Sequence, residues 1–252
     1  MVEEKGVGYR SCSETGASAP PAAVRWLAER GLTAAAVDEW RRLAAIRPLG
    51  RAEALAAAET AVRHGDRMAA IRFLRQAMPA LGGPGIEDEP ADAVRAYLPL
   101  PYAAEVRAAA AESGLDPWLV AAVARQESTF HPRARSPRNA RGLMQLLAGT
   151  ARGHGVALGL GPTPDLEDPA VNLRLGAREL AAQLARWDAV EPALAAYNAG
   201  PSRVARWRDR WRDPEELAEQ IPIPETYTYV RRVVYLAEAY RLVYAETWRE
   251  VS

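Results

Sequence analysis

The sequence predicts an all-α protein with at most a small β-element. Apolar residues recur at three- and four-residue spacing in segments such as VRWLAERGL and MAAIRFLRQAM, the pattern of a helix with one buried face. Gly and Pro end these runs after three or four turns, which is typical of short helices joined by turns. With 252 residues, 49% of them hydrophobic and 25% charged, the chain is long enough to bury a substantial core.

The chain divides into four predicted segments. Residues 1–20 are rich in Gly, Ser, Pro and charge, and we expect a disordered leader. Residues 21–81 predict an extension of helical hairpins, which we expect to pack on a neighbouring domain, because fewer than three clear repeats would make an independent solenoid marginal. Residues 82–94, dense in Gly, Pro and acid, are the predicted linker to a domain at 95–252. The hairpin helices are separated by turn residues at Gly31, Pro48, Gly50 and Gly65.

Helical patterns resume after the predicted linker. Asp116 can cap the helix PWLVAAVARQES, and Pro117 occupies its first turn. Residues 129–165 are richer in Gly and Pro, and we expect loops and any β-element there. Later helices are predicted at 169–187, 191–196, 202–211 and 225–247.

Composition disfavours several classes of function. The 32 basic and 32 acidic side chains cancel, so the whole molecule has no field that would attract nucleic acid or an anionic membrane. The single cysteine, Cys12, allows no internal disulfide and no thiolate metal cluster. The N-terminus shows no apolar run of a signal peptide, and no stretch approaches the roughly 20 apolar residues of a membrane span.

Glu127 is the first candidate for chemistry. It follows Val123 by four residues in an apolar helix, so its carboxylate turns towards the buried face. Such a carboxylate either pairs with a cation or has its pKa raised by desolvation. The arginines near in sequence are Arg125, Arg133, Arg135 and Arg141. A pKa of roughly 6 to 7 would suit a general acid.

Four stretches in one order resemble the soluble lytic murein transglycosylases, the family of the transglycosylase SLT domain. They are ES-x-F at 127–130, SP-x-x-A-x-GLMQ at 136–145, AYNAGP at 196–201 and ET-x-x-YV at 225–230. Weaker agreement surrounds Asn172 and Gly176. The resemblance covers roughly residues 95–245 and implies a lysozyme-like catalytic domain. The hairpins before it resemble the end of the helical superhelix in larger members of the family.

The resemblance implies an enzyme that cleaves the β-1,4 bond between N-acetylmuramic acid and N-acetylglucosamine in peptidoglycan, with Glu127 as acid and then base. Ordinary glycosidases use two carboxylates, whereas here the substrate's own acetamido group would stabilise the developing cation. The six-hydroxyl of the sugar then closes on the anomeric carbon and gives a 1,6-anhydromuramyl product. We expect neither a metal nor an organic cofactor.

The resemblance also assigns substrate contacts. Ser136 matches a serine near the reacting sugar, although a turn role before Pro137 explains it nearly as well. Met144 matches a cleft wall and Gln145 a sugar-binding amide; a Met at helical spacing is more often core. One departure is Asn139, which stands where the family commonly has Gly and which tolerates a positive φ better than most residues.

Three further residues complete the expected site. Tyr197 matches a tyrosine beside the catalytic acid. Asn198 is a supporting sugar contact, although the turn N-A-G-P explains it about as well. Glu225 matches a position that binds a sugar or peptide stem, but by itself it is also a carboxylate favoured at a helix start. If Glu225 lay across the cleft from Glu127 at the distance found in inverting glycosidases, hydrolysis would become possible.

Two alternatives stay open. A goose-type lysozyme would share the fold and the single glutamate but release reducing muramyl ends. A peptidoglycan-binding or assembly protein would keep the fold without turnover, and the N-terminal hairpins would then contact cell-wall assembly partners. The resemblance places the protein in the cell envelope, periplasmic or extracellular, with peptidoglycan glycan strands as its partner.

Overall fold

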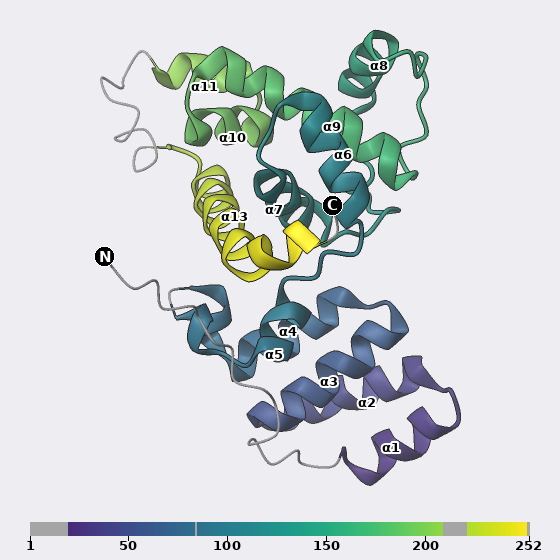
Figure 1. The fold of residues 1–252 in the computed structure, drawn as a ribbon. Coiled ribbons are helices and arrows are strands. Elements are labelled where there is room, and N and C mark those ends of the chain that lie inside the picture. The colour runs from purple at the N-terminus through teal and green to yellow at the C-terminus, as the bar shows by residue number, and fades with distance from the viewer. Residues whose placement is uncertain (1–19, 84, 209–220, 251–252) are drawn as a thin grey trace. The chain divides into compact units, whose positions relative to one another are not determined.

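The computed structural model describes residues 20–83, 85–208 and 221–250 (Figure 1). The chain forms two compact units, Met1–Pro99 and Leu100–Ser252. In the described part the regular structure is helical, and β-pairing is confined to isolated bridges. This confirms the all-α prediction with a small β-element. The predicted disordered leader lies outside the described residues except at Pro20.

The first unit is built from helical hairpins, as the sequence predicted. α1 (Ala22–Glu29) packs on α2 (Thr33–Ile46), α2 packs on α3 (Arg51–His64), and α3 packs on α4 (Arg67–Ala77). Gly65 ends α3 in the left-handed conformation, with φ +85°, which only Gly adopts without strain. The predicted turn residues therefore all lie between helices.

The core of the first unit joins one large aromatic side chain to small ones. Trp40 is fully buried, and its indole Nε1 donates a hydrogen bond of 3.3 Å to Thr60 Oγ1 on α3. The buried face of α3 carries alanines, including Ala57 and Ala61. Small side chains let neighbouring helices approach closely, and Trp40 fills the remaining volume while its one polar atom is satisfied.

The predicted linker at 82–94 does not separate the two units; it belongs to the first. It contains η3 (Ile86–Asp88) and the start of α5 (Ala91–Tyr97), which contacts α3 and α4. Ile86 is buried, and the buried Glu89 forms an ion pair with Arg51. These contacts hold a Gly- and Pro-rich segment in place, so the boundary falls between Pro99 and Leu100 instead.

The second unit is a bundle in which α7 packs against α13, while α9 packs against α6 and α10 (Figure 1). As predicted, the Asp116 side chain caps α7 by accepting from Trp118 N, with Pro117 in the first turn. No helix in the described ranges is both long and apolar enough to cross a membrane. The helices of this unit are α6 (Ala103–Ser113), α7 (Pro117–Ser128), α8 (Ala148–Ala157), α9 (Pro169–Trp187), α10 (Val190–Ala199), α11 (Pro201–Arg208) and α13 (Pro224–Glu250).

The prediction of loops throughout residues 129–165 was wrong at α8. The helix has the sequence AGTARGHGVA, and its three glycines lower its intrinsic helix propensity. Packing overrides that preference. Ala151 is buried, and a Cβ on Gly155 would come within 2.5 Å of the carbonyl oxygen of Gly161, so only Gly permits this approach of helix and loop.

Candidate active site

Glu127 lies in the last turn of α7, where the chain leaves the helix abruptly. Thr129 and Phe130 follow with φ of +54° and +57°, and the Phe130 ring is fully buried. Ser128 Oγ donates to the carbonyl oxygen of Leu143 at 2.8 Å, which joins the end of α7 to the loop beyond it. Glu127 therefore stands on a rigid helix end rather than on a loop.

A pocket of about 500 Å³ opens over Glu127. Three helices supply its walls: the end of α7, the end of α10 and the first turns of α13. The lining residues are polar or charged apart from one proline; they are Gln126, Glu127, Asn198, Pro224, Glu225, Thr228, Tyr229 and Arg232. Such a pocket suits a hydroxyl-rich ligand better than an apolar one.

Burial raises the pKa of Glu127 to about 7. Tyr229 opposes this shift by favouring the ionised form, and the nearby negative charge of Glu225 adds to it. The alternative, in which Glu127 pairs with an arginine, is not observed among the described residues: Arg133 and Arg135 lie near Glu167 instead. A half-protonated carboxyl at neutral pH can donate a proton and take one back.

Tyr229 lies close to the Glu127 carboxyl, but the two side chains do not form a hydrogen bond of normal geometry. Its hydroxyl oxygen is buried and has no hydrogen-bond partner of normal geometry within the described part of the chain. It is still near enough to lower the pKa of Glu127, whose charge in turn adds to the rise that burial causes in the pKa of Tyr229. A buried polar group without a partner is costly and invites a functional explanation.

Tyr197 connects α10 to the loop that carries Met144. Its hydroxyl donates to the carbonyl oxygen of Met144 at 2.8 Å. Burial and the charge of Glu127 both raise the pKa of Tyr197, so the phenol stays neutral beside the acid. The geometry thus puts Tyr197 near Glu127, as the sequence predicted, and bonds its hydroxyl to the loop backbone.

The loop that carries Met144 is held by a buried amide on α9. Asn172 is fully buried; its Oδ1 accepts from Met144 N at 2.8 Å, and its Nδ2 donates to the carbonyl oxygens of Arg141 and Leu166 at 3.1 and 3.0 Å. Gly142 has φ +78°, and a Cβ there would lie 2.1 Å from Asn172 Nδ2. One side chain therefore satisfies three backbone groups and requires a glycine beside it.

Ser136, Asn139 and Gln145 shape this loop. Ser136 Oγ accepts from the backbone N–H of Arg138 and Ala140, at 3.2 and 3.0 Å, which is a turn role. Asn139 has φ +61°, which confirms the expected positive φ. Gln145 Nε2 donates to two loop carbonyl oxygens, at 3.1 and 2.9 Å. Two antiparallel bridges, Arg135 with Arg141 and Arg141 with Leu146, form the small β-element.

Met144 has a different environment from the other predicted contacts. Its side chain is fully buried, and a Cβ on Gly176 would lie 2.3 Å from the Met144 sulfur. The interior position agrees with the core role that helical spacing favours for methionine. Its backbone, by contrast, contacts both Asn172 and Tyr197.

Asn198 and Glu225 reach the pocket from two helices. Glu225 lies in the first turn of α13, where a carboxylate is favoured by the helix dipole. Asn198 Oδ1 accepts from the hydroxyl of Thr226 at 2.8 Å, which ties α10 to α13 and orients the amide. The Asn198 Nδ2 group is then left as one of the donors that the pocket can offer to a ligand.

The structure thus brings Glu127, Asn198 and Glu225 into one pocket, with Tyr197 near the acid. Ser136, Met144 and Gln145 do not line this pocket; they belong to the loop that is bonded to the end of α7 through Ser128 and to α10 through Tyr197. The sequence interpretation missed further lining residues, although one of them stood inside a quoted motif, ET-x-x-YV. The missed residues are Gln126, Thr228, Tyr229 and Arg232. In the described ranges, no three His, Cys, Asp or Glu side chains lie close enough together to hold a metal ion.

Residues 105–219 match the family described as the transglycosylase SLT domain. This match covers most of the second unit. A putative soluble lytic murein transglycosylase of Haemophilus influenzae is 36% identical over 143 residues, 54% of this chain and 24% of the relative. The soluble lytic murein transglycosylase of Escherichia coli is 37% identical over 128 residues, 48% of this chain and 20% of the relative. The resemblance drawn from the four motifs is confirmed.

The second unit and the hairpins before it also match solved structures. An inactive mutant of the lytic transglycosylase Slt from Pseudomonas aeruginosa superposes with a TM-score of 0.70 at 32% identity, over 86% of this chain and 34% of that chain. A match of this extent exceeds the second unit, so the similarity continues into the hairpins. The chain spans about a quarter or less of the two curated relatives named above.

Proposed function

We propose that this protein is a lytic transglycosylase that cleaves the β-1,4 bond between N-acetylmuramic acid and N-acetylglucosamine in peptidoglycan. The single observation that carries the proposal is Glu127, a carboxyl with a pKa of about 7 that lines a polar pocket within the residues that match the SLT domain. We assign Glu127 as the catalytic acid and base. Because peptidoglycan lies in the cell envelope, we place the activity there.

In the proposed reaction the protonated Glu127 donates its proton to the glycosidic oxygen, and the bond from that oxygen to the anomeric carbon breaks. The carbonyl oxygen of the substrate's acetamido group stabilises the cation. The carboxylate of Glu127 then accepts the proton of the six-hydroxyl as its oxygen bonds to the anomeric carbon. The product is a 1,6-anhydromuramyl end, and Glu127 is protonated again, so acid and base are one residue.

Tyr229 and Tyr197 have different roles in this cycle. The unpartnered hydroxyl of Tyr229 can donate to the Glu127 carboxylate after proton transfer, when the negative charge is present. Tyr197 positions the loop of Met144 and Gln145 against the pocket through its bond to the Met144 carbonyl. We assign Asn198 to a sugar contact inside the pocket. We assign Gln145, whose Nε2 is bonded to its own loop, to a sugar contact beyond the pocket through its Oε1. Ser136 and Met144 contribute through the shape of their loop.

A hydrolytic muramidase is the second candidate, because Glu225 lines the same pocket as Glu127. With two carboxylates, Glu225 would activate a water that attacks the anomeric carbon. The substrate-assisted route needs no such base. The two candidates therefore differ in the end that they leave on the muramyl sugar.

Mass spectrometry of purified peptidoglycan after incubation with the wild-type protein and with Glu127→Gln decides between them. Anhydromuramyl products made by the wild type alone are expected. Reducing muramyl ends would establish hydrolysis on the same fold. The absence of any product from well-folded protein would leave a binding or assembly role, in which the hairpins contact cell-wall partners.

A further inference from the structure

Arg232 brings a guanidinium into the pocket over Glu127. The pocket residues that come from the body of α13 recur at three- and four-residue spacing, so they form one stripe along one face of the helix. Gln126 and Glu127 approach this stripe from the end of α7, which packs on α13. The stripe consists of Glu225, Thr228, Tyr229 and Arg232.

The stripe has a carboxylate at one end and the guanidinium at the other. At a rise of about 1.5 Å per residue, Arg232 lies about 10 Å along the helix axis from Glu225 and about 4.5 Å from Tyr229. The Glu127 carboxyl lies close to Tyr229, between the two ends. A ligand over Glu127 therefore meets negative charge on one side and positive charge on the other.

The Arg232 guanidinium is available to a ligand. Its residue is exposed, and it forms no ion pair or hydrogen bond with another residue of the described ranges. The preceding arginine, Arg231, instead places its guanidinium over the ring of Tyr227, 5.8 Å from the centroid. An unpaired guanidinium binds a carboxylate well, because its planar fork can donate two parallel hydrogen bonds.

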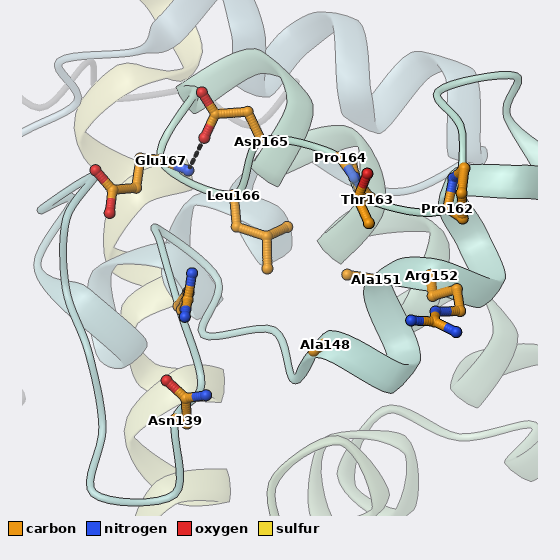
Figure 2. A pocket seen from close by; sticks show the side chains of 11 residues that line it. Asn139, Ala148, Ala151, Arg152, Pro162, Thr163, Pro164, Asp165, Leu166 and Glu167 are labelled. Atoms are coloured by element: carbon orange, nitrogen blue, oxygen red, sulfur yellow. Dashed lines mark hydrogen bonds between the residues drawn. The ribbon is translucent and has the colours of Figure 1, made fainter.

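The charged hollow elsewhere in the second unit does not supply this contact. Arg152 lines that hollow of about 290 Å³, between the first turns of α8 and the loop 162–167 (Figure 2). It shares no residue with the pocket over Glu127. In the part of the chain that the structure describes, Arg232 is therefore the one cation that lines the pocket of the acid.

The proposed substrate has a group that matches a cation so close to the acid. The N-acetylmuramic acid whose anomeric bond breaks carries a lactyl group, attached to the same ring through an ether. In strands with peptide stems the lactyl carboxyl is an amide and has no charge, whereas after removal of the stem it is a carboxylate. The first carboxylate of an intact stem lies at least one amino-acid residue further out, so the short separation of Arg232 from the acid favours the lactyl carboxylate.

We propose that Arg232 binds the free lactyl carboxylate of glycan strands whose peptide stems have been removed, and that the protein cleaves such denuded strands in preference to strands with stems. The choice of ligand rests on the proposed function. The negative charge of Glu225 repels the carboxylate from the opposite end of the stripe and so helps to orient the sugar. The reaction that would supply this substrate is hydrolysis of the lactyl amide: water is added, the stem leaves as an amine, and the carboxylate stays on the sugar.

The test compares chemically matched strands. Denuded strands are prepared with an amidase, and part of them is converted to the methyl ester, which keeps the lactyl group but removes its charge. We expect the wild-type protein to cleave the free acid with a kcat/KM about tenfold higher than the ester, since the ester lacks one charge-assisted contact. In Arg232→Gln this ratio should fall to about one, and Arg232→Lys should keep part of it, because lysine retains the charge without the planar fork.

Arg231→Gln is the matched control, because Arg231 is exposed on the same helix and does not line the pocket. It should keep the wild-type ratio. Since the ratio compares two substrates on one protein sample, a variant that merely folds less well does not change it. The proposal is overturned if the wild type cleaves acid and ester equally, if it prefers strands with intact stems, or if Arg232→Gln keeps the preference for the acid.

Binding of the same acid and ester strands to the Glu127→Gln protein, measured by calorimetry, separates this proposal from the proposed function. Cleavage by the wild type with no preference for the acid in either assay would overturn the Arg232 site and leave the transglycosylase proposal standing. Preferential binding of the acid, with no cleavage by the wild type, would support the Arg232 site and overturn the proposed function.

Discussion

The Tyr197 hydroxyl donates a 2.8 Å hydrogen bond to the Met144 carbonyl oxygen and so connects α10 to the loop that follows α7. This bond crosses from one predicted motif to another, from AYNAGP to GLMQ. The phenol that lies beside the acid is therefore also the group that fixes the position of the opposing loop.

Tyr197→Phe removes this bond and leaves the buried Met144 carbonyl without its side-chain partner. We expect a loss of about 1–2 kcal/mol of unfolding free energy. We also expect kcat per folded molecule to fall, because the loop is no longer held in position relative to Glu127. Thermal unfolding and turnover measured on the same protein check this; wild-type kcat in the variant would reduce Tyr197 to a packing residue.

Glu127→Gln should reduce turnover at least about a hundredfold, because an amide cannot donate and recover the proton. It should also change stability in a pH-dependent way. The folded pKa of about 7 lies above the ordinary value of 4.5, so the stability contributed by the protonated form is complete below about 4.5 and lost as pH rises through about 7.

The variant should therefore be more stable than wild type at pH 8, by on the order of 2 kcal/mol, and show little such gain at pH 4. Thermal denaturation at the two pH values measures the difference. An equal shift at both would mean that the carboxyl is not titrating with the raised pKa.

Glu225→Gln and Tyr229→Phe should move the alkaline limb of the pH–rate profile in opposite directions. The charge of Glu225 raises the pKa of Glu127, so its removal lowers that pKa and activity falls at a lower pH. Tyr229 lowers the pKa of Glu127, so its removal moves the limb to a higher pH. Rate profiles of both variants test this, and shifts of the same sign would contradict the arrangement.

The amount of remaining activity in Glu225→Gln carries separate information. The substrate-assisted route predicts weakened cleavage with anhydromuramyl products. Complete loss would favour two-carboxylate hydrolysis. Tyr229→Phe should unfold at nearly the wild-type temperature, since the hydroxyl has no bond of normal geometry to lose within the described chain.

Asn172→Ala should be among the most destabilising single substitutions in the second unit. It leaves three backbone groups without their hydrogen-bond partner, and two of them, the Met144 N–H and the Leu166 carbonyl, are buried. We therefore expect the free energy of unfolding to fall by about 2–4 kcal/mol. Arg174→Ala on the same helix is the control: its ion pair with Glu112 is partly exposed and should be worth at most about 1 kcal/mol. Equal losses in the two variants, measured by denaturant unfolding, would contradict the role of Asn172 in holding the loop.

Local patterns predicted most of the helices correctly. The cap at Asp116, the helix at Pro169–Trp187 and the turn at Gly65 follow from short-range preferences that hold wherever the segment lies. α8 escaped prediction because its glycines disfavour a helix in isolation. The linker at 82–94 was misplaced because its Gly- and Pro-rich composition suggests a free connection, whereas the ion pair of Arg51 and Glu89 holds it to the first unit. This contact is long-range and cannot be predicted from the local sequence.

The sequence by itself determined the helical class, the position of Glu127 at a helix end and, through four ordered motifs, the resemblance to the SLT family. Only the tertiary structure decided which groups surround that carboxyl. Tyr229 and Arg232 lie about a hundred residues from Glu127 along the chain, and their place beside it follows from the packing of α13 on α7. The pKa of Glu127 likewise depends on desolvation by side chains distant in sequence, which no local pattern can encode.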